Sequence, residues 1–94
     1  MFKILIAEDD RELRNLFSRV LTKSGYAVRQ AQNGKEALDS LESEYADLII
    51  SDIMMPVMNG YELVRTLRER GSQTPVLMIT AKEAFDDMRL GYGA

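Results

Sequence analysis

The sequence predicts an α/β fold built on a parallel, doubly wound sheet. Short apolar runs, typical of buried strands, alternate with longer stretches in which apolar residues recur every three to four positions, as in amphipathic helices. This alternation occurs four times, which favours one parallel sheet with helices on both faces. A chain of 94 residues with 46% hydrophobic residues has the size and composition of a single small globular domain.

Four short runs are predicted to form the strands. They are KILIA (3–7), YAVRQ (26–30), DLIIS (47–51) and VLMIT (76–80), the last of which follows Pro75. Connections between parallel strands are right-handed, so the carboxyl ends of all four runs should meet at one edge of the sheet. Open α/β sheets bind their ligands at that edge, so functional residues are expected there.

The segments between and after the strands are predicted to be helices. The first ends near Gly25 and carries an apolar stripe that is expected to face the core: Leu13, Leu16, Phe17, Val20 and Leu21. The second and third begin at Asn33 and Asn59, because each is followed by a glutamate three positions later, a capping pattern. Gly71 is expected to end the third helix, and a shorter last helix is predicted over 83–90.

Acidic residues follow two of the predicted strands. Glu8 and Asp9 come after the first strand, Asp52 after the third, and Thr80 closes the fourth; Asp10 is interpreted as a helix N-cap. If the first and third strands are neighbours, the acids converge, and their mutual repulsion calls for a cation. A site of oxygen ligands suits a hard ion such as Mg²⁺.

Asp52 also fits the role of a nucleophile toward phosphorus. Phosphoryl transfer depends mainly on positioning and charge neutralisation, which a carboxylate at a strand end beside a metal provides. The Thr80 hydroxyl could donate a hydrogen bond to a phosphoryl oxygen, and the small Ala81 would leave room for the group. Pro56 restricts the loop that follows Asp52.

Composition argues against several other classes of protein. The chain has no cysteine and no histidine, which removes thiolate metal sites and the commonest general base. A net charge of −3 disfavours a nucleic-acid-binding face. No apolar run reaches the roughly 18 residues of a membrane span, and the amino-terminal run turns acidic too early for a signal peptide. We therefore expect a cytoplasmic protein that binds neither nucleic acid nor membrane.

Four segments, ILIAEDD, NGKEAL, DLIISDIMMPVMNGYEL and TPVLMITA, resemble the receiver domain of bacterial two-component response regulators. The match stays in register over nearly the whole chain, so one receiver domain over residues 1–94 is expected. The resemblance implies a flavodoxin-like fold with strand order 2-1-3-4.

The resemblance also implies roles for individual residues. Asp52 would accept a phosphoryl group from a sensor histidine kinase. Glu8, Asp9, Asp52 and the backbone carbonyl of Met54 would bind Mg²⁺. Thr80 would be the switch hydroxyl beside Ala81, and Pro56 and Gly60 would be structural residues of the loop.

Receiver domains continue with a fifth strand, which carries a lysine that pairs with the phosphate, and a fifth helix. This chain ends at Ala94, so we expect a truncated receiver domain without them. The fourth strand would then be an open sheet edge and part of the first helix's stripe would lose its cover. That exposure predicts a homodimer or larger assembly through the fourth strand and the first helix.

Two alternatives to phosphorelay signalling stay open. One is a phosphatase with a strand-end aspartate nucleophile, but such enzymes usually carry a second aspartate two positions later, where this chain has Met54. The other is an assembly module that does not signal. We expect no enzyme in the usual sense, since a receiver domain at most accepts and loses its own phosphoryl group.

Overall fold

The computed structural model describes residues 1–79, within which four parallel strands form one sheet in the order β2-β1-β3-β4. The strands are β1 (Lys3–Ala7), β2 (Ala27–Ala31), β3 (Leu48–Asp52) and β4 (Val76–Ile79). The predicted parallel sheet and its strand order are confirmed. Thr80, Ala81 and the helix predicted over 83–90 lie outside the described residues.

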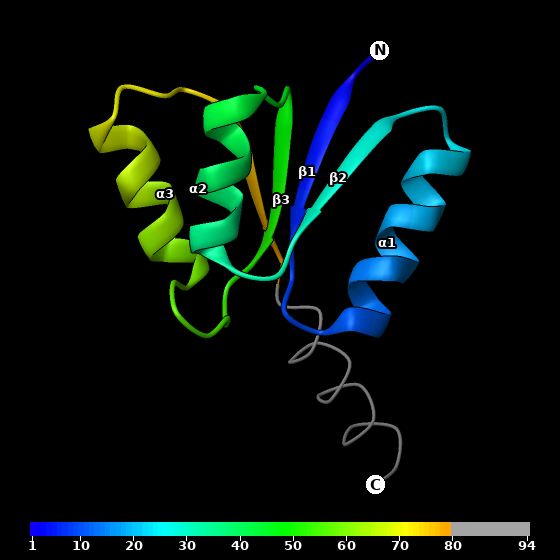
Figure 1. Ribbon diagram of the computed structural model, residues 1–94, viewed down its shortest axis with the longest axis horizontal. Helices are drawn as coiled ribbons and strands as arrows, with labels where there is room; N and C mark the ends of the chain where they lie inside the picture. The colour runs from blue at the N-terminus through cyan, green and yellow to red at the C-terminus, as the bar shows by residue number, and fades with distance from the viewer. Residues whose placement is uncertain (80–94) are drawn as a thin grey trace, which may run out of the picture.

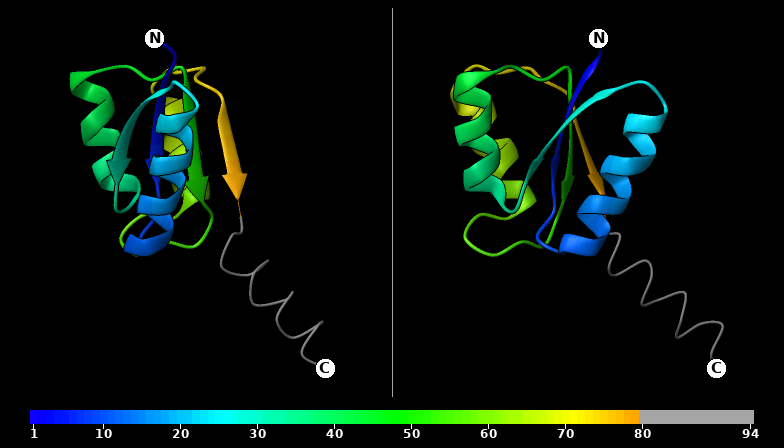
Figure 2. Two further views of the ribbon diagram at one scale, coloured as in Figure 1. Left: turned by 90° about the vertical axis from the view of Figure 1, so that its right-hand side faces the viewer. Right: turned by 45° about the vertical axis from the view of Figure 1, so that its right-hand side comes forward.

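Helices cover both faces of this sheet. In the described part of the chain they are α1 (Arg11–Lys23), α2 (Gly34–Ser43) and α3 (Gly60–Glu69). α1 lies on one face, and α2 and α3 lie together on the other (Figures 1 and 2). This arrangement confirms the doubly wound fold. Within residues 1–79, no helix combines the length and the apolar character that crossing a bilayer requires.

Side-chain caps fix where the three helices begin. Asp10 accepts hydrogen bonds on Oδ1 from the N–H groups of Glu12 and Leu13, at 2.9 and 3.2 Å, which confirms its predicted role as an N-cap. Asn33 caps α2, and Asn59 caps α3 in a reciprocal capping box. These caps satisfy amide donors that a helix start leaves without intrahelical partners.

The hydrophobic core lies between the sheet and the pair α2 and α3. Its largest fully buried members include Leu5, Ile49 and Leu63. Ile4 and Ile6 alternate with Leu5 along β1 and are also buried, at 2% and 0% exposure. β1 is therefore covered on both faces, as its continuous apolar run predicts.

The first helix differs from its predicted pattern. Two residues of the expected core stripe, Leu16 and Val20, are 46% and 54% exposed. The buried residue of α1 is instead a charged one, Arg14, at 9% exposure. The exposure of Leu16 and Val20 agrees with the expectation that part of this stripe lacks cover, whereas the burial of Arg14 was not expected.

Candidate functional site

The register of β1 and β3 brings two of the predicted site residues together. Ile6 on β1 pairs with Ile50 on β3. Glu8 follows Ile6 by two positions, and Asp52 follows Ile50 by two positions. Residues two apart on a strand point to the same face, so both acids should lie on the face covered by α1. Asp52 is the last residue of β3, one residue beyond the predicted strand end.

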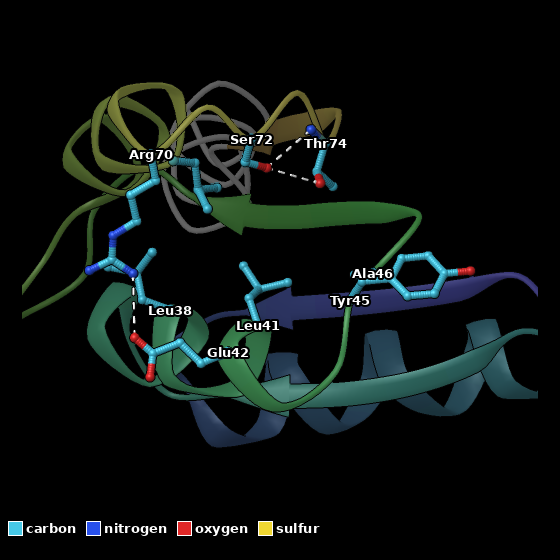
Figure 3. A pocket seen from close by; sticks show the side chains of 9 residues that line it. Leu38, Leu41, Glu42, Tyr45, Ala46, Arg70, Ser72 and Thr74 are labelled. Carbon is cyan, nitrogen blue, oxygen red and sulfur yellow. Dashed lines mark hydrogen bonds and ion pairs between the residues drawn. The ribbon is translucent and has the colours of Figure 1, made fainter.

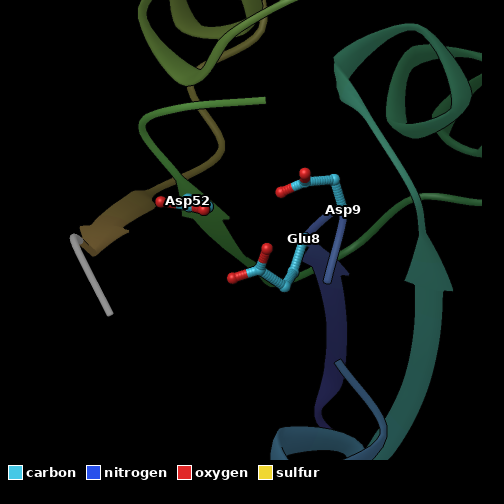
Figure 4. Close-up of side chains that lie close together, drawn as sticks. All are labelled: Glu8, Asp9 and Asp52. Atoms are coloured by element: carbon cyan, nitrogen blue, oxygen red, sulfur yellow. The ribbon is translucent and has the colours of Figure 1, made fainter. Parts of the chain in front are cut away.

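The three predicted acids converge at the carboxyl ends of these neighbouring strands (Figure 4). Glu8, Asp9 and Asp52 each offer a carboxylate oxygen, and these oxygens lie within 4.8 Å of one another. Glu8 and Asp52 are buried, and Asp9 is partly exposed. A group of oxygen ligands open on one side is the type of site that Mg²⁺ occupies in proteins.

One oxygen of Asp52 supports the assignment of a cation site. Asp52 Oδ2 is buried and has no hydrogen-bond partner among residues 1–79. A buried carboxylate oxygen without a partner is costly, and a coordinated cation would remove that cost. The side chains present therefore fit Mg²⁺, which would neutralise the acids and draw charge from a phosphoryl oxygen.

Glu8 is held at both its backbone and its side chain. Its N–H donates to the carbonyl oxygen of Ala31 on β2, at 3.1 Å. Its Oε2 accepts a hydrogen bond from the N–H of Asp10, at 2.9 Å. Asp10 also caps α1, so the start of this helix and the acidic site are built on the same short loop.

Arg14 contributes a further contact that the sequence reasoning missed. Its Nη1 donates to the Glu8 carbonyl oxygen at 2.9 Å, and its Nε donates to Gln30 Oε1 on β2 at 3.1 Å. A sequence signal did exist: Arg14 precedes Phe17 and Leu21 by three and seven positions, so it falls on the predicted apolar face. A charged residue at such a position needs a buried partner.

The loop after Asp52 is packed tightly against the end of β3. The Gly60 N–H donates to the Ile53 carbonyl oxygen at 2.9 Å. A Cβ atom at Gly60 would lie 2.5 Å from the Asp52 carbonyl oxygen, which is too close for any side chain. Glycine at this position lets α3 begin directly beside Asp52.

The middle of this loop is a strained turn. The Met58 N–H donates to the Pro56 carbonyl oxygen at 2.7 Å, and Val57 between them has a φ of 69°. This is a classic γ-turn, rare for a β-branched residue. The Met58 carbonyl oxygen accepts from the Gly34 N–H at 3.1 Å, which ties the loop to α2.

Met54 lies at the start of the same loop, with a side chain that is 62% exposed. Coordination of the metal by its backbone carbonyl remains a prediction. The predicted roles of Thr80 and Ala81 fall outside the described residues.

A separate hollow of about 250 Å³ lies between α2 and α3. It is lined by Leu38, Leu41, Glu42, Tyr45, Ala46, Leu67, Arg70, Ser72 and Thr74 (Figure 3). Arg70 and Glu42 form an ion pair at 3.6 Å beside it. The hollow contains none of the acids at the carboxyl edge, so it is separate from the candidate site, which is defined by convergent side chains.

Comparison with known proteins places this geometry in a family. The family model of the response regulator receiver domain matches residues 4–93. Response regulator MprA of Mycolicibacterium vanbaalenii is 39% identical over 92 residues, which are 98% of this chain and 40% of that protein. MprA of Mycobacterium avium is 38% identical with the same coverage of both chains. The chain thus spans about 40% of the length of these curated relatives.

Solved structures give the same result. Chemotaxis protein CheY4 of Vibrio cholerae aligns with a TM-score of 0.79 and 40% identity, over 83% of this chain and 67% of that one. The receiver domain of Francisella response regulator 1452 aligns with a TM-score of 0.80 and 32% identity, over 83% and 64% of the two chains. The chain therefore belongs to the receiver domain family of two-component response regulators.

Proposed function

We propose that this receiver domain accepts a phosphoryl group on Asp52, with Mg²⁺ held by Glu8, Asp9 and Asp52. The observation that carries the proposal is the convergence of three carboxylate oxygens within 4.8 Å at the end of β1 and β3. The phosphodonor would be the phosphohistidine of a sensor histidine kinase.

The transfer is a displacement at phosphorus. A carboxylate oxygen of Asp52 forms the new O–P bond while the N–P bond of phosphohistidine breaks, and the imidazole nitrogen keeps the electron pair and takes up a proton. The product is an acyl phosphate. The protein's part is mainly positioning: β3 fixes Asp52, and the packed loop that begins at Ile53 limits its movement.

The domain acts as an acceptor and not as an enzyme with turnover in this proposal. A phosphatase of the strand-end aspartate type would need an acid two positions after the nucleophile, and that position is Met54. We therefore rank the phosphatase below the acceptor.

Phosphate incorporation tests the proposal directly. The wild-type chain is incubated with acetyl phosphate and MgCl₂, and its intact mass is measured. We expect one added phosphoryl group in the wild type, none in Asp52→Ala, and normal incorporation in Asp39→Ala, because Asp39 is an exposed acid on α2 that pairs with Lys35 at 3.5 Å. Equal incorporation in Asp52→Ala would exclude Asp52 as the acceptor.

We also propose self-association through β4 and α1. Met78 faces α3, because its Sδ lies 2.9 Å from the position of a Cβ at Gly60. The neighbouring Leu77 must then face the α1 side, and it is 53% exposed. With the exposed Leu16 and Val20, it forms apolar surface that a second copy could cover.

Sedimentation equilibrium at micromolar concentration tests this association. We expect a dimer or larger assembly for the wild type and for Lys35→Ala, whose side chain is exposed on α2. Leu77→Lys should weaken association. A stable wild-type monomer would contradict the proposal.

A further inference from the structure

Arg14 is a buried charge without a role in the proposed chemistry. It is 9% exposed on a helix whose apolar neighbours Leu16 and Val20 are far more exposed. Burying a guanidinium group is costly unless its donors find good acceptors. Arg14 reaches two such acceptors.

The first acceptor is the backbone at the acidic site itself. Arg14 Nη1 donates to the carbonyl oxygen of Glu8 at 2.9 Å. That carbonyl belongs to the peptide group that joins Glu8 to Asp9. A peptide group is planar and rigid, so holding its oxygen in place also restricts the backbone orientation of both Glu8 and Asp9.

The second acceptor fixes Arg14 in turn. Its Nε donates to Gln30 Oε1 at 3.1 Å, and Gln30 lies on β2, which pairs with β1 at Ile6. A guanidinium group presents its donors in a rigid fork, so one side chain spans both acceptors with little freedom. The fork connects α1, β2 and the loop after β1.

We propose that Arg14 is a positioning residue that sets the Mg²⁺ affinity of the acidic site by fixing the Glu8–Asp9 peptide. This inference rests on the proposed binding of Mg²⁺ at Glu8, Asp9 and Asp52. Outer-shell partners of metal ligands typically contribute between tenfold and a hundredfold to metal affinity. Arg14 belongs to this class because it acts on the ligands and does not touch the metal.

If Arg14 acts only through its charge, its replacement should change the Mg²⁺ affinity in one direction. If it acts by positioning the ligands, the change should be in the other direction. A cation beside a metal site repels the metal, so removing it by Arg14→Gln should tighten Mg²⁺ binding if only charge matters. If positioning matters, the same variant should bind Mg²⁺ more weakly. Arg14→Lys keeps the charge but replaces the fork by a single ammonium group, so it should also bind more weakly.

The test measures Mg²⁺ dissociation constants by two-dimensional NMR titration of the amide signals, with urea unfolding of each variant in parallel. We expect Arg14→Gln and Arg14→Lys to bind about tenfold more weakly than the wild type. The matched control is Arg11→Gln, which removes an exposed cation from the same helix and should bind as tightly as the wild type or more tightly. A merely structural role would lower the urea midpoint and leave the dissociation constant of the folded protein unchanged.

Gln30→Met provides a second probe, because Gln30 is exposed and its loss should leave the fold intact. It should weaken Mg²⁺ binding by a smaller factor, with no further loss in the Arg14→Gln background, since the two residues act as one unit. If the Arg14 variants do not fold, Gln30→Met alone decides.

Three results would overturn the inference. They are Mg²⁺ binding by a folded Arg14→Gln at wild-type strength or tighter, an unchanged affinity in Gln30→Met, and a wild type that does not bind Mg²⁺. The last also defeats the proposed metal site, whereas the first two leave that site standing.

Discussion

At the amino end of the sheet, acids are paired with cations, whereas at the carboxyl end three acids lie together. Glu44, just after α2, lies 2.8 Å from Lys3 Nζ and 3.7 Å from Arg29 Nη1. Asp47 Oδ2 accepts a hydrogen bond from the Lys3 N–H at 2.7 Å. Arg29 also donates to the Glu44 carbonyl oxygen at 2.7 Å, which helps to close the carboxyl end of α2.

The carboxyl end of the sheet differs in how its charged side chains are arranged. Like charges share one site, Asp52 Oδ2 has no hydrogen-bond partner among residues 1–79, and Val57 in the adjoining loop is strained. Paired charges stabilise the fold without a ligand, while gathered charges oppose folding until a cation binds. The proposed metal site lies at the end where like charges gather.

The largest expected effect is a difference in stability loss between two glycine substitutions, Gly60→Ala and Gly71→Ala. Gly60→Ala at the carboxyl end forces a Cβ against the Asp52 carbonyl oxygen, and we expect a loss of about 3 kcal/mol in the free energy of unfolding. A Cβ atom at Gly71, after α3, would have no atom within 4 Å, but the φ of +82° is unfavourable for alanine. Gly71→Ala should therefore lower the free energy of unfolding by about 1 kcal/mol. Urea unfolding measures both, and equal losses would contradict the close packing assigned to Gly60.

The second prediction concerns the acids themselves. Asp52→Asn removes one charge from the cluster, so in Mg²⁺-free buffer it should raise the free energy of unfolding by about 1–2 kcal/mol. Glu44→Gln at the other end removes a paired charge and should bring no such gain. Chemical unfolding of both variants decides, and a loss of stability in Asp52→Asn would show that the site is not strained by its charge.

The third effect is smaller and concerns the backbone. Val57 is 75% exposed, so Val57→Gly loses little packing while it relieves a left-handed conformation. We expect a gain of about 1 kcal/mol in the free energy of unfolding. Val57→Ala serves as the control, because it keeps a Cβ atom and should gain less. A destabilised Val57→Gly would mean that the turn is not a source of strain.

The smallest effect is the pH dependence of the amino end. The hydrogen bond with Lys3 lowers the pKa of Glu44 below its ordinary value of 4.5, and the hydrogen bond with Glu44 raises the pKa of Lys3 above 10.5. The Glu44 contribution is present above its ordinary pKa and is lost as the pH falls through the lowered one. The Lys3 contribution is present below its ordinary pKa and is lost as the pH rises through the raised one.

Wild type should therefore exceed Glu44→Gln in stability between about pH 5 and pH 10, and the difference should vanish at either extreme. Both side chains reach solvent, so the difference should be small and should shrink with added salt. Thermal melts across this pH range test it. A difference that stays undiminished as the pH falls through and below the lowered pKa of Glu44 would rule out the ion pair as its source.

Much of this fold follows from local sequence patterns. The strand runs, the caps at Asn33 and Asn59 and the glycines after α1 and α3 were predicted because each depends on neighbours within a few residues. The convergence of Glu8, Asp9 and Asp52 also followed, since strand ends and crossover handedness place them. Element boundaries differed from expectation by a residue, as at Asp52, which ends β3.

Other features depend on contacts that no local pattern specifies. Arg14 was missed because its partners, the Glu8 carbonyl oxygen and Gln30, come from two other segments. The turn at Val57 was not predicted, and the Met58 carbonyl oxygen that follows it accepts a hydrogen bond from Gly34 on α2, which is distant in the sequence.

The most direct test of the central claim is the melting temperature as a function of Mg²⁺ concentration. If Glu8, Asp9 and Asp52 form a metal site, the wild-type melting temperature should rise with MgCl₂ at constant ionic strength, because the ion binds only the folded state. Asp9→Asn should abolish that rise, and Glu44→Gln should keep it. A wild-type melting temperature that stays constant up to roughly tens of millimolar Mg²⁺, where even a weak site should be filled, would contradict the account.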